Sequence, residues 1–218
     1  MCKEIDVKYI PHIEEMTDEE IIRVMGEDTS ADKISCANWP GEYPYVPEVL
    51  VNFAFSDKVL ALLYRVKEEH ILGSVLENNG SVWDDSCVET FIKDPVSEGY
   101  YNFEVNCIGT KLAAHRLSRT DFELFEEEKI AKVRCIASLP HQQIDMRNAA
   151  DSQWVIGLMI PFSVLGLDRA PESLRGNFYK CGDKCDQTHY LSWSPIGLPE
   201  PNFHCPDFFG KLNLVKLD

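Results

Sequence analysis

The sequence predicts an all-β fold, a two-sheet antiparallel β-sandwich with one short N-terminal helix. Short apolar or alternating segments recur along the chain, and turn residues separate them at frequent intervals. Ten such segments fit within 218 residues, 44% of which are hydrophobic, so the chain can bury one substantial core. Only one segment carries a clear helix signal. We therefore expect a single domain built from short strands.

The helix is predicted near the N-terminus. Thr17 and Glu20 have the spacing of a capping box, in which each side chain bonds the backbone N–H of the other residue. Apolar residues follow at positions 21, 22 and 24, and Gly26 can end the helix. We expect residues 1–47 to form an N-terminal extension that packs on the sandwich or begins it, and residues 48–217 to form its core.

The strands are predicted from apolar runs and from period-two alternation. Two of them flank Ser56-Asp57-Lys58 and make a hairpin. In chain order the predicted strands are Val49–Phe55, Val59–Val66, Ile71–Leu76, Cys87–Ile92, Tyr100–Cys107, Lys111–His115, Lys129–Ala137, Gln153–Ile160, His189–Trp193 and Lys211–Leu217.

Composition restricts the partners of the protein. The formal net charge is −15 and the sequence pI is near 4.8, which disfavours nucleic acid and anionic membrane surfaces, because both are bound chiefly through clustered Lys and Arg. The longest uncharged apolar run, Trp154–Leu167, is too short to span a bilayer and contains Pro161. The N-terminus shows no secretory signal. We expect a cytoplasmic protein, or an extracellular or periplasmic one if a leader has been removed.

Eight cysteines are present, and we expect most of them to be free thiols. Disulfide frameworks stabilise small secreted domains that lack a core, whereas this chain is long enough to build one. Cys107 also falls in step with the apolar residues of its predicted strand, as a small buried hydrophobe would.

The most informative strand is the one around residues 101–107. Alternation places Asn102, Glu104 and Asn106 on one face and apolar residues on the other. Asn and Glu are depleted from strands, so three of them in alternate positions favour a binding surface, although a solvated outer face is the simpler explanation.

Two tryptophans accompany polar residues elsewhere in the chain. Trp83 lies beside acidic residues that include Asp85 and Glu89, and Trp193 precedes a loop that contains Asn202 and His204. A sugar ring presents apolar C–H patches on its faces and hydroxyls around its rim, so its receptor needs an aromatic platform and hydrogen-bonding side chains. An isolated Trp would more simply be a core residue.

Three motifs occur in the order found in carbohydrate-binding module family 9 and the related DOMON-like sandwiches. They are Trp83 to Glu89, Asn-Phe-Glu-Val-Asn at 102–106, and Leu-Ser-Trp-Ser at 191–194 followed by Pro-Asp-Phe-Phe-Gly-Lys-Leu at 206–212. The chain resembles this family over roughly Glu48 to Leu217.

The resemblance implies a non-catalytic protein of polysaccharide utilisation that binds a mono- or oligosaccharide or the end of a polysaccharide chain. It further implies that Trp83 and Trp193 clamp one sugar ring. Glu89 and Asn106 match polar positions of the family and would contact the hydroxyls. Asp85, Glu104, Asn202 and His204 are further candidates for these contacts, because they are polar residues of the same motifs or of the loop after Trp193. Better-known members carry a basic residue in the polar strand where this chain has Glu104, so the hydroxyl contacts are expected to differ.

Four alternatives stay open. Paired carboxylates could serve a glycoside hydrolase, and exposed aromatics could instead form a protein-interaction surface. The resemblance also allows structural calcium, although no loop carries a calcium signature. A zinc site is the fourth alternative. Its candidate ligands are Cys181, Cys185, His189, His204 and Cys205.

Overall fold

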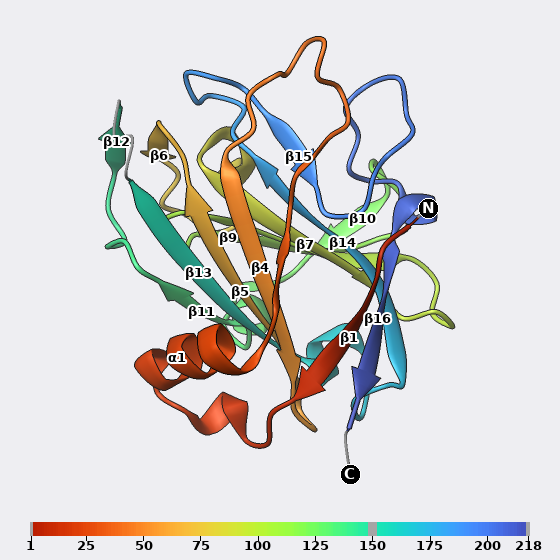
Figure 1. The fold of residues 1–218 in the computed structure, drawn as a ribbon. Helices are drawn as coiled ribbons and strands as arrows, with labels where there is room; N and C mark the ends of the chain where they lie inside the picture. Colours follow the sequence, from red (N-terminus) through yellow and green to blue (C-terminus); the bar gives the residue numbers. More distant parts are fainter. Residues whose placement is uncertain (1, 148–151, 217–218) are drawn as a thin grey trace.

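The computed structural model describes residues 2–147 and 152–216, which fold into two packed layers of strands (Figure 1). The first layer holds β3 (Cys36–Ala37), β7 (Cys87–Lys93), β8 (Tyr100–Asn106), β9 (Lys111–Arg116), β10 (Phe122–Leu124), β14 (Ser173–Cys181), β15 (Tyr190–Ser192) and β16 (Gly210–Val215). The second holds β2 (Ala31–Lys33), β4 (Glu48–Phe55), β5 (Val59–Lys67), β11 (Arg134–Ala137) and β13 (Gln153–Pro161). The predicted β-sandwich is confirmed.

One strand joins the two layers. β1 (Glu4–Tyr9) pairs in parallel with β16 over most of its length, and its last two residues pair in parallel with β4. The other pairings within the two layers are antiparallel. A separate two-stranded ladder consists of β6 (Ile71–Gly73) and β12 (Ile144–Met146).

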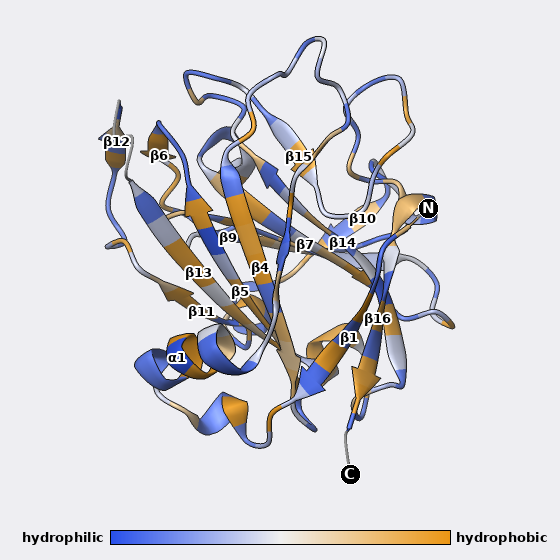
Figure 2. Cartoon of the chain, in the orientation of Figure 1, coloured by the Kyte–Doolittle hydropathy of each residue, from blue (hydrophilic) through white to orange (hydrophobic). Residues whose placement is uncertain are grey.

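The main core fills the space between the layers. Alternation sends one set of side chains of each strand inward, as Val88 and Ile92 of β7 and Phe103 of β8 illustrate. Figure 2 shows the strands of the second layer largely in hydrophobic colours, interrupted by polar positions. All eight cysteines are free thiols, where the sequence predicts that most of them are. Among the residues described, no helix is both long and apolar enough to cross a bilayer.

Each layer is also covered on its outer face. On the second layer, α1 (Asp18–Asp28) and the 3₁₀ turn η1 (Ile13–Glu15) bury a smaller apolar cluster that includes Ile21 and Met25. On the first layer, loops and the 3₁₀ turns η2 (Val82–Asp84) and η4 (Pro206–Phe208) cover another cluster. The remaining helical segments are α2 (Glu127–Ile130) and η3 (Phe162–Leu165). The polar cleft described below opens in the cover of the first layer.

The predicted helix and strands need local corrections. Both bonds of the capping box at Thr17 and Glu20 are present, but the helix continues through Gly26 to Asp28. The predicted strand at 129–137 begins only at Arg134, because Glu127–Ile130 forms the helical turn α2. The predicted strand at 71–76 ends at Gly73. The end of the last predicted strand, Leu217, lies outside the described residues.

Candidate functional site

A cleft of about 380 Å³ opens on the outer face of the first layer. This volume is within the range of small-molecule sites. Most of its lining side chains are polar or aromatic, and they come from strands β7 to β10, from β14 and β15, from η2 and from three loops. The lining residues are Trp83, Glu89, Glu104, Arg116, Arg119, Phe122, Cys181, Asp183, Tyr190, Pro201, Asn202, Phe203 and His204. We call this set the Trp83 cleft.

The floor of the Trp83 cleft is set by strand register. Glu89 of β7 is directly opposite Glu104 of β8, and both side chains point to the outer face because their neighbours in the strands point into the core. Both glutamates are only 4% exposed. Two carboxyl groups thus lie side by side beneath the opening of the cleft.

The two carboxyl groups hold protons more tightly than glutamates in water. Burial, and then the neighbouring carboxylate of Glu104, raise the pKa of Glu89 well above its usual value. Burial also raises the pKa of Glu104, to about 7, against the opposing effect of Arg116. Near neutral pH the pair therefore carries less than two negative charges, and it offers both hydrogen-bond acceptors and a hydroxyl donor.

Asn102 connects Glu104 to a guanidinium group. Its amide Nδ2 donates to Glu104 Oε1 at 2.7 Å, and its Oδ1 accepts from Arg116 Nε at 2.8 Å. The Arg116 guanidinium lies over the ring of Phe122, 4.2 Å from the ring centroid. Phe122 itself is 46% exposed. A planar cation and an exposed ring therefore form one side of the cleft.

Trp83 and the loop at 201–204 line other parts of the cleft. Trp83 is 37% exposed. In the loop, Asn202 Oδ1 accepts from the backbone N of His204 at 2.9 Å, and the Nδ1 of His204 lies 2.9 Å from the Tyr100 hydroxyl. Burial, together with Arg116 and Arg119, lowers the pKa of His204 to about 3. His204 is thus neutral at physiological pH.

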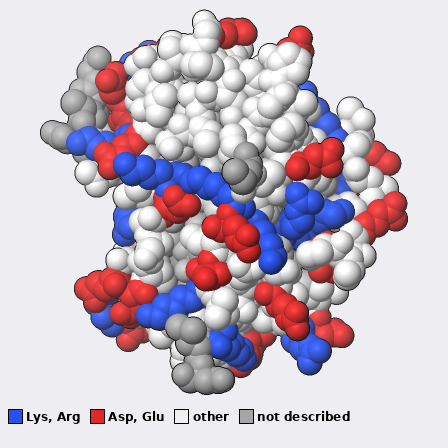
Figure 3. Space-filling view, turned by 45° about the vertical axis from the view of Figure 1, so that its right-hand side comes forward, with Lys and Arg blue, Asp and Glu red and all other residues white. Residues whose placement is uncertain are grey.

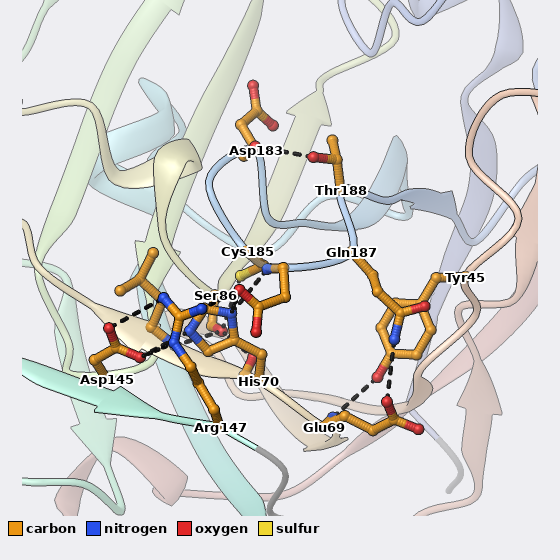
Figure 4. Close-up of polar contacts among 12 residues, drawn as sticks. Tyr45, Glu69, His70, Ser86, Asp145, Arg147, Asp183, Cys185, Gln187 and Thr188 are labelled. Carbon is orange, nitrogen blue, oxygen red and sulfur yellow. Dashed lines mark hydrogen bonds and ion pairs between the residues drawn. The ribbon is translucent and has the colours of Figure 1, made fainter.

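Asp183 is held in the cleft by an anchored loop. The loop carries Asp183 near one end and closes on itself through the Thr188 hydroxyl, which donates to the Asp183 carbonyl at 3.0 Å. At its far side, the Asp186 backbone N donates to His70 Nδ1 at 2.8 Å, and Arg147 makes ion pairs with Asp186 and Asp145 (Figure 4). The buried Oδ1 of Asp183 has no hydrogen-bond partner among the residues described.

Trp193 does not contribute to the cleft, so the predicted pair of clamping tryptophans is wrong. Its side chain is 0% exposed and packs in the main core against Phe53 and Phe178. Strand alternation explains this placement, because Leu191 and Trp193 share the inward face of the chain around β15. The alternate residue Tyr190 lines the cleft instead.

Asp85 and Asn106 are structural rather than cleft residues. Both are 0% exposed and neither lines the cleft. Asp85 accepts hydrogen bonds from the backbone and hydroxyl of Ser74, from the backbone of Val75 and from Asn106 Nδ2, at 2.6 to 2.9 Å. Asn106 Oδ1 accepts from the Thr110 backbone at 2.9 Å. The two side chains hold together the turns beside β6, η2 and β8. The other predicted residues, Glu89, Glu104, Asn202, His204 and Trp83, do line the cleft.

The five zinc candidates do not come together. Lys180 Nζ and the Gln187 carbonyl lie 2.8 and 2.7 Å from the two ring nitrogens of His189, and Cys205 Sγ donates to the Asn202 carbonyl. Within residues 2–147 and 152–216, three or more potential ligands converge only at Cys87, Glu89 and Cys181 and at His12, Glu14 and Glu15. The predicted zinc set is therefore wrong. Structural calcium stays a prediction.

Sequence reasoning missed several cleft residues. Arg116, Arg119 and Phe122 lie beyond the polar strand in a segment that carried no motif, and Arg116 reaches the cleft because β9 pairs with β8. It supplies a guanidinium beside Glu104, where relatives were expected to carry a basic residue. Alternation within Lys111–Arg116 could have placed Arg116 on the same face as Leu112, but nothing local could show that this face borders Glu104.

A larger hollow of about 670 Å³ lies on the second layer beside η3. It is lined by charges of both signs, such as Lys58, Arg134 and Asp168, and its aromatic side chain, Phe162, is buried. On the face drawn in Figure 3, basic side chains likewise lie beside acidic ones, and an uncharged area covers the top. The Trp83 cleft differs in joining an exposed indole to buried carboxylates.

Comparison with known proteins identifies the family. The model of carbohydrate-binding family 9 matches residues 18–214, whereas no curated protein matches the chain. A candidate carbohydrate-binding protein from Bacteroides uniformis is 32% identical, with a TM-score of 0.92 over 99% of this chain and 100% of the other.

A family 9 module from Caldicellulosiruptor kristjanssonii has the same fold at low identity. Its complex with glucose gives 14% identity and a TM-score of 0.64 over 99% of this chain and 97% of the other. Its complex with cellotriose gives 13% and 0.66 over 99% and 95%. Since the family model covers most of the sequence, this chain belongs to carbohydrate-binding family 9.

Proposed function

We propose that the protein binds carbohydrate without catalysing a reaction, and that the Trp83 cleft holds a sugar unit of a mono- or oligosaccharide or of a polysaccharide chain end. Membership of family 9 supports this proposal, as do the glucose and cellotriose bound by the Caldicellulosiruptor kristjanssonii module. A role in polysaccharide utilisation fits the same ligand class. The observation that carries the proposal is an exposed indole, Trp83, in a cleft floored by the buried pair Glu89 and Glu104.

The chemistry of the cleft matches the two kinds of surface on a pyranose. The indole of Trp83 offers an apolar face for the C–H groups of the ring, and the exposed ring of Phe122 is the second aromatic surface. Glu89 and Glu104 accept hydrogen bonds from neighbouring hydroxyls. Arg116 already donates through Nε to Asn102 and through Nη1 to the Arg119 carbonyl, and its other N–H groups can donate to ring or hydroxyl oxygens.

A glycoside hydrolase is the alternative that the paired carboxylates raise. Such an enzyme needs its acid and its nucleophile or base on the two sides of the scissile bond. Glu89 and Glu104 are instead neighbours on adjacent strands of one sheet and face the cleft from the same floor. This arrangement suits two adjacent hydroxyls better than in-line attack at one carbon.

The test is a glycan screen followed by calorimetry on the sugar that binds. Dissociation constants between about micromolar and millimolar are expected for one or a few sugar units. Trp83→Ala should weaken binding at least tenfold, on the order of 1.4 kcal/mol or more, because the stacking platform is lost. Phe122→Ala should weaken it less. The matched control is Leu124→Ala. Leu124 is an exposed apolar residue of β10, the strand that carries Phe122, but its side chain does not line the cleft.

Unchanged affinity in Trp83→Ala, with the fold intact by circular dichroism, would show that the sugar binds elsewhere. An aryl-glycoside assay on the same proteins separates binding from catalysis. Turnover that disappears in Glu89→Gln and Glu104→Gln but persists in the exposed control Glu123→Gln would favour the hydrolase instead.

A further inference from the structure

Two cysteines and a glutamate converge beneath the Trp83 cleft. Cys87 of β7 and Cys181 of β14 are directly opposite each other in the antiparallel ladder, and Glu89 follows Cys87 by two residues on the same face. The two sulfur atoms and a carboxylate oxygen all lie within 4.8 Å of one another. Cys181 Sγ donates to Glu89 Oε1 at 3.1 Å. All three side chains are buried.

We propose that Cys87, Glu89 and Cys181 form a binding site for a thiophilic divalent cation, Zn²⁺, in the floor of the cleft. Two sulfurs and one carboxylate oxygen are ligands that zinc accepts, and their mutual distances allow tetrahedral coordination after small side-chain adjustments. The set differs from the loop cysteines and histidines that spacing suggested, because strand pairing, not sequence proximity, brings Cys87 to Cys181.

The position of the site leaves its fourth ligand open. Glu89 and Cys181 both line the Trp83 cleft, whereas Cys87 lies behind them. A cation held by the three side chains would therefore face the cleft with one coordination position free for water or a sugar hydroxyl. The cleft also supplies the entry path that a buried site needs.

Zinc binding at this site is linked to proton release. Burial raises the pKa of the Cys87 thiol to about 11, the hydrogen bond with Cys87 and then burial raise the pKa of the Cys181 thiol, and burial raises the pKa of Glu89. Zinc binding therefore displaces a proton from each thiol and any proton that Glu89 carries. Two thiolates, the Glu89 carboxylate and one dication leave a single net negative charge. The Arg116 guanidinium, which acts to lower the pKa of Glu89, partly offsets that charge.

The test uses the folded protein kept reduced by a phosphine, treated with chelator, and titrated with Co²⁺ as a spectroscopic probe and then with Zn²⁺. We expect one equivalent of Co²⁺ to produce a thiolate-to-cobalt charge-transfer absorption that Zn²⁺ abolishes by displacement. Cys87→Ser should lose this absorption and bind Zn²⁺ at least about tenfold more weakly. Cys135→Ser is the matched control, since Cys135 lies on β11 in the other layer and should leave the absorption unchanged.

Absence of the absorption in the wild-type protein, or its persistence in Cys87→Ser, would overturn the proposal. If Cys87→Ser does not fold, Cys181→Ala is the second variant, and retained absorption in it has the same meaning. The site goes beyond the proposed sugar binding, and its readout needs no sugar. Because Cys87 does not line the cleft, chelated Cys87→Ser should still bind the sugar found in the screen, so the two proposals fail separately.

Discussion

Trp193 donates its indole N–H to Asp32 Oδ2 at 2.7 Å, a bond between residues 161 positions apart in the sequence. Asp32 in turn pairs with Lys3, so the bond ties the chain around β15 to β2 and to the N-terminal segment. The tryptophan that a family pattern assigns to ligand contact is here a structural residue. Its indole face packs in the main core, and its polar N–H reaches a carboxylate at the edge of that core.

Trp193→Ala should therefore reduce stability and leave sugar contacts intact. Truncating a fully buried tryptophan costs about 3–5 kcal/mol, because apolar contacts are lost and a cavity remains. Urea unfolding measures this loss, and calorimetry at a temperature where the variant is folded measures the affinity. Trp83→Ala should show the opposite pattern, with a small change in stability and a large change in binding. A Trp193 variant that is stable but no longer binds sugar would contradict this assignment.

Asp85→Asn should destabilise the fold by about 2–3 kcal/mol. The carboxylate accepts four hydrogen bonds inside the protein, and an amide in its place would turn a donor toward other donors. Thermal unfolding followed by circular dichroism checks the prediction. The exposed Asp121→Asn should shift the melting temperature little, and an equally small shift for Asp85→Asn would refute the structural role.

His204 should make the protein less stable in acid. Burial, together with Arg116 and Arg119, lowers the pKa of His204 from 6.5 to about 3. Between these two pH values the imidazole is protonated in the unfolded chain but neutral in the folded protein. The stability that the neutral form of His204 contributes to the folded protein is complete above about pH 6.5. It is lost as the pH falls toward 3, and the free energy of unfolding decreases by no more than about 1.4 kcal/mol per pH unit.

The measurement for His204 is urea unfolding between pH 7 and pH 4 of the wild type and of His204→Gln. The stability of the wild type relative to the variant should decline over this range. His12→Gln is the control, because His12 is exposed and lies outside the cleft. Parallel pH curves for the wild type and His204→Gln would rule out the assigned shift.

Lys180 and Glu68 form an ion pair with both side chains 0% exposed and 2.9 Å between Nζ and Oε2. Glu68 also accepts from the indole N–H of Trp154 at 2.7 Å, and Lys180 lies 2.8 Å from His189 Nε2. Lys180→Met or Glu68→Leu alone should lower the free energy of unfolding by about 3–5 kcal/mol, because each leaves the other charge buried without its partner. The stability loss of the double variant should be at least about 2 kcal/mol smaller than the sum of the losses of the two single variants. A double-mutant cycle measures this difference. Strict additivity would argue against coupling.

Local pattern was sufficient for most of the strands. Thr17 and Glu20 form the predicted capping box, and β4, β5, β7, β8, β9 and β13 lie within one or two residues of their predicted ends. The nine residues of β14 were missed, although this strand pairs with β7, β15 and β16. Its inward positions include Lys180, whose burial depends on Glu68 from another part of the chain.

The sequence alone determined the sandwich, the polar face of β8 and the placement of Trp83 and Glu89 in one motif, because alternation and turn residues act over a few positions. Only the tertiary structure decided which polar residues reach the cleft. Asp85 and Asn106 are buried and hydrogen-bonded to each other, and Trp193 packs in the main core. Arg116 reaches the cleft from β9, the strand that pairs with β8. Packing between segments distant in sequence decides which face of a sheet is exposed to solvent. It also decides which strands are neighbours in the sheet.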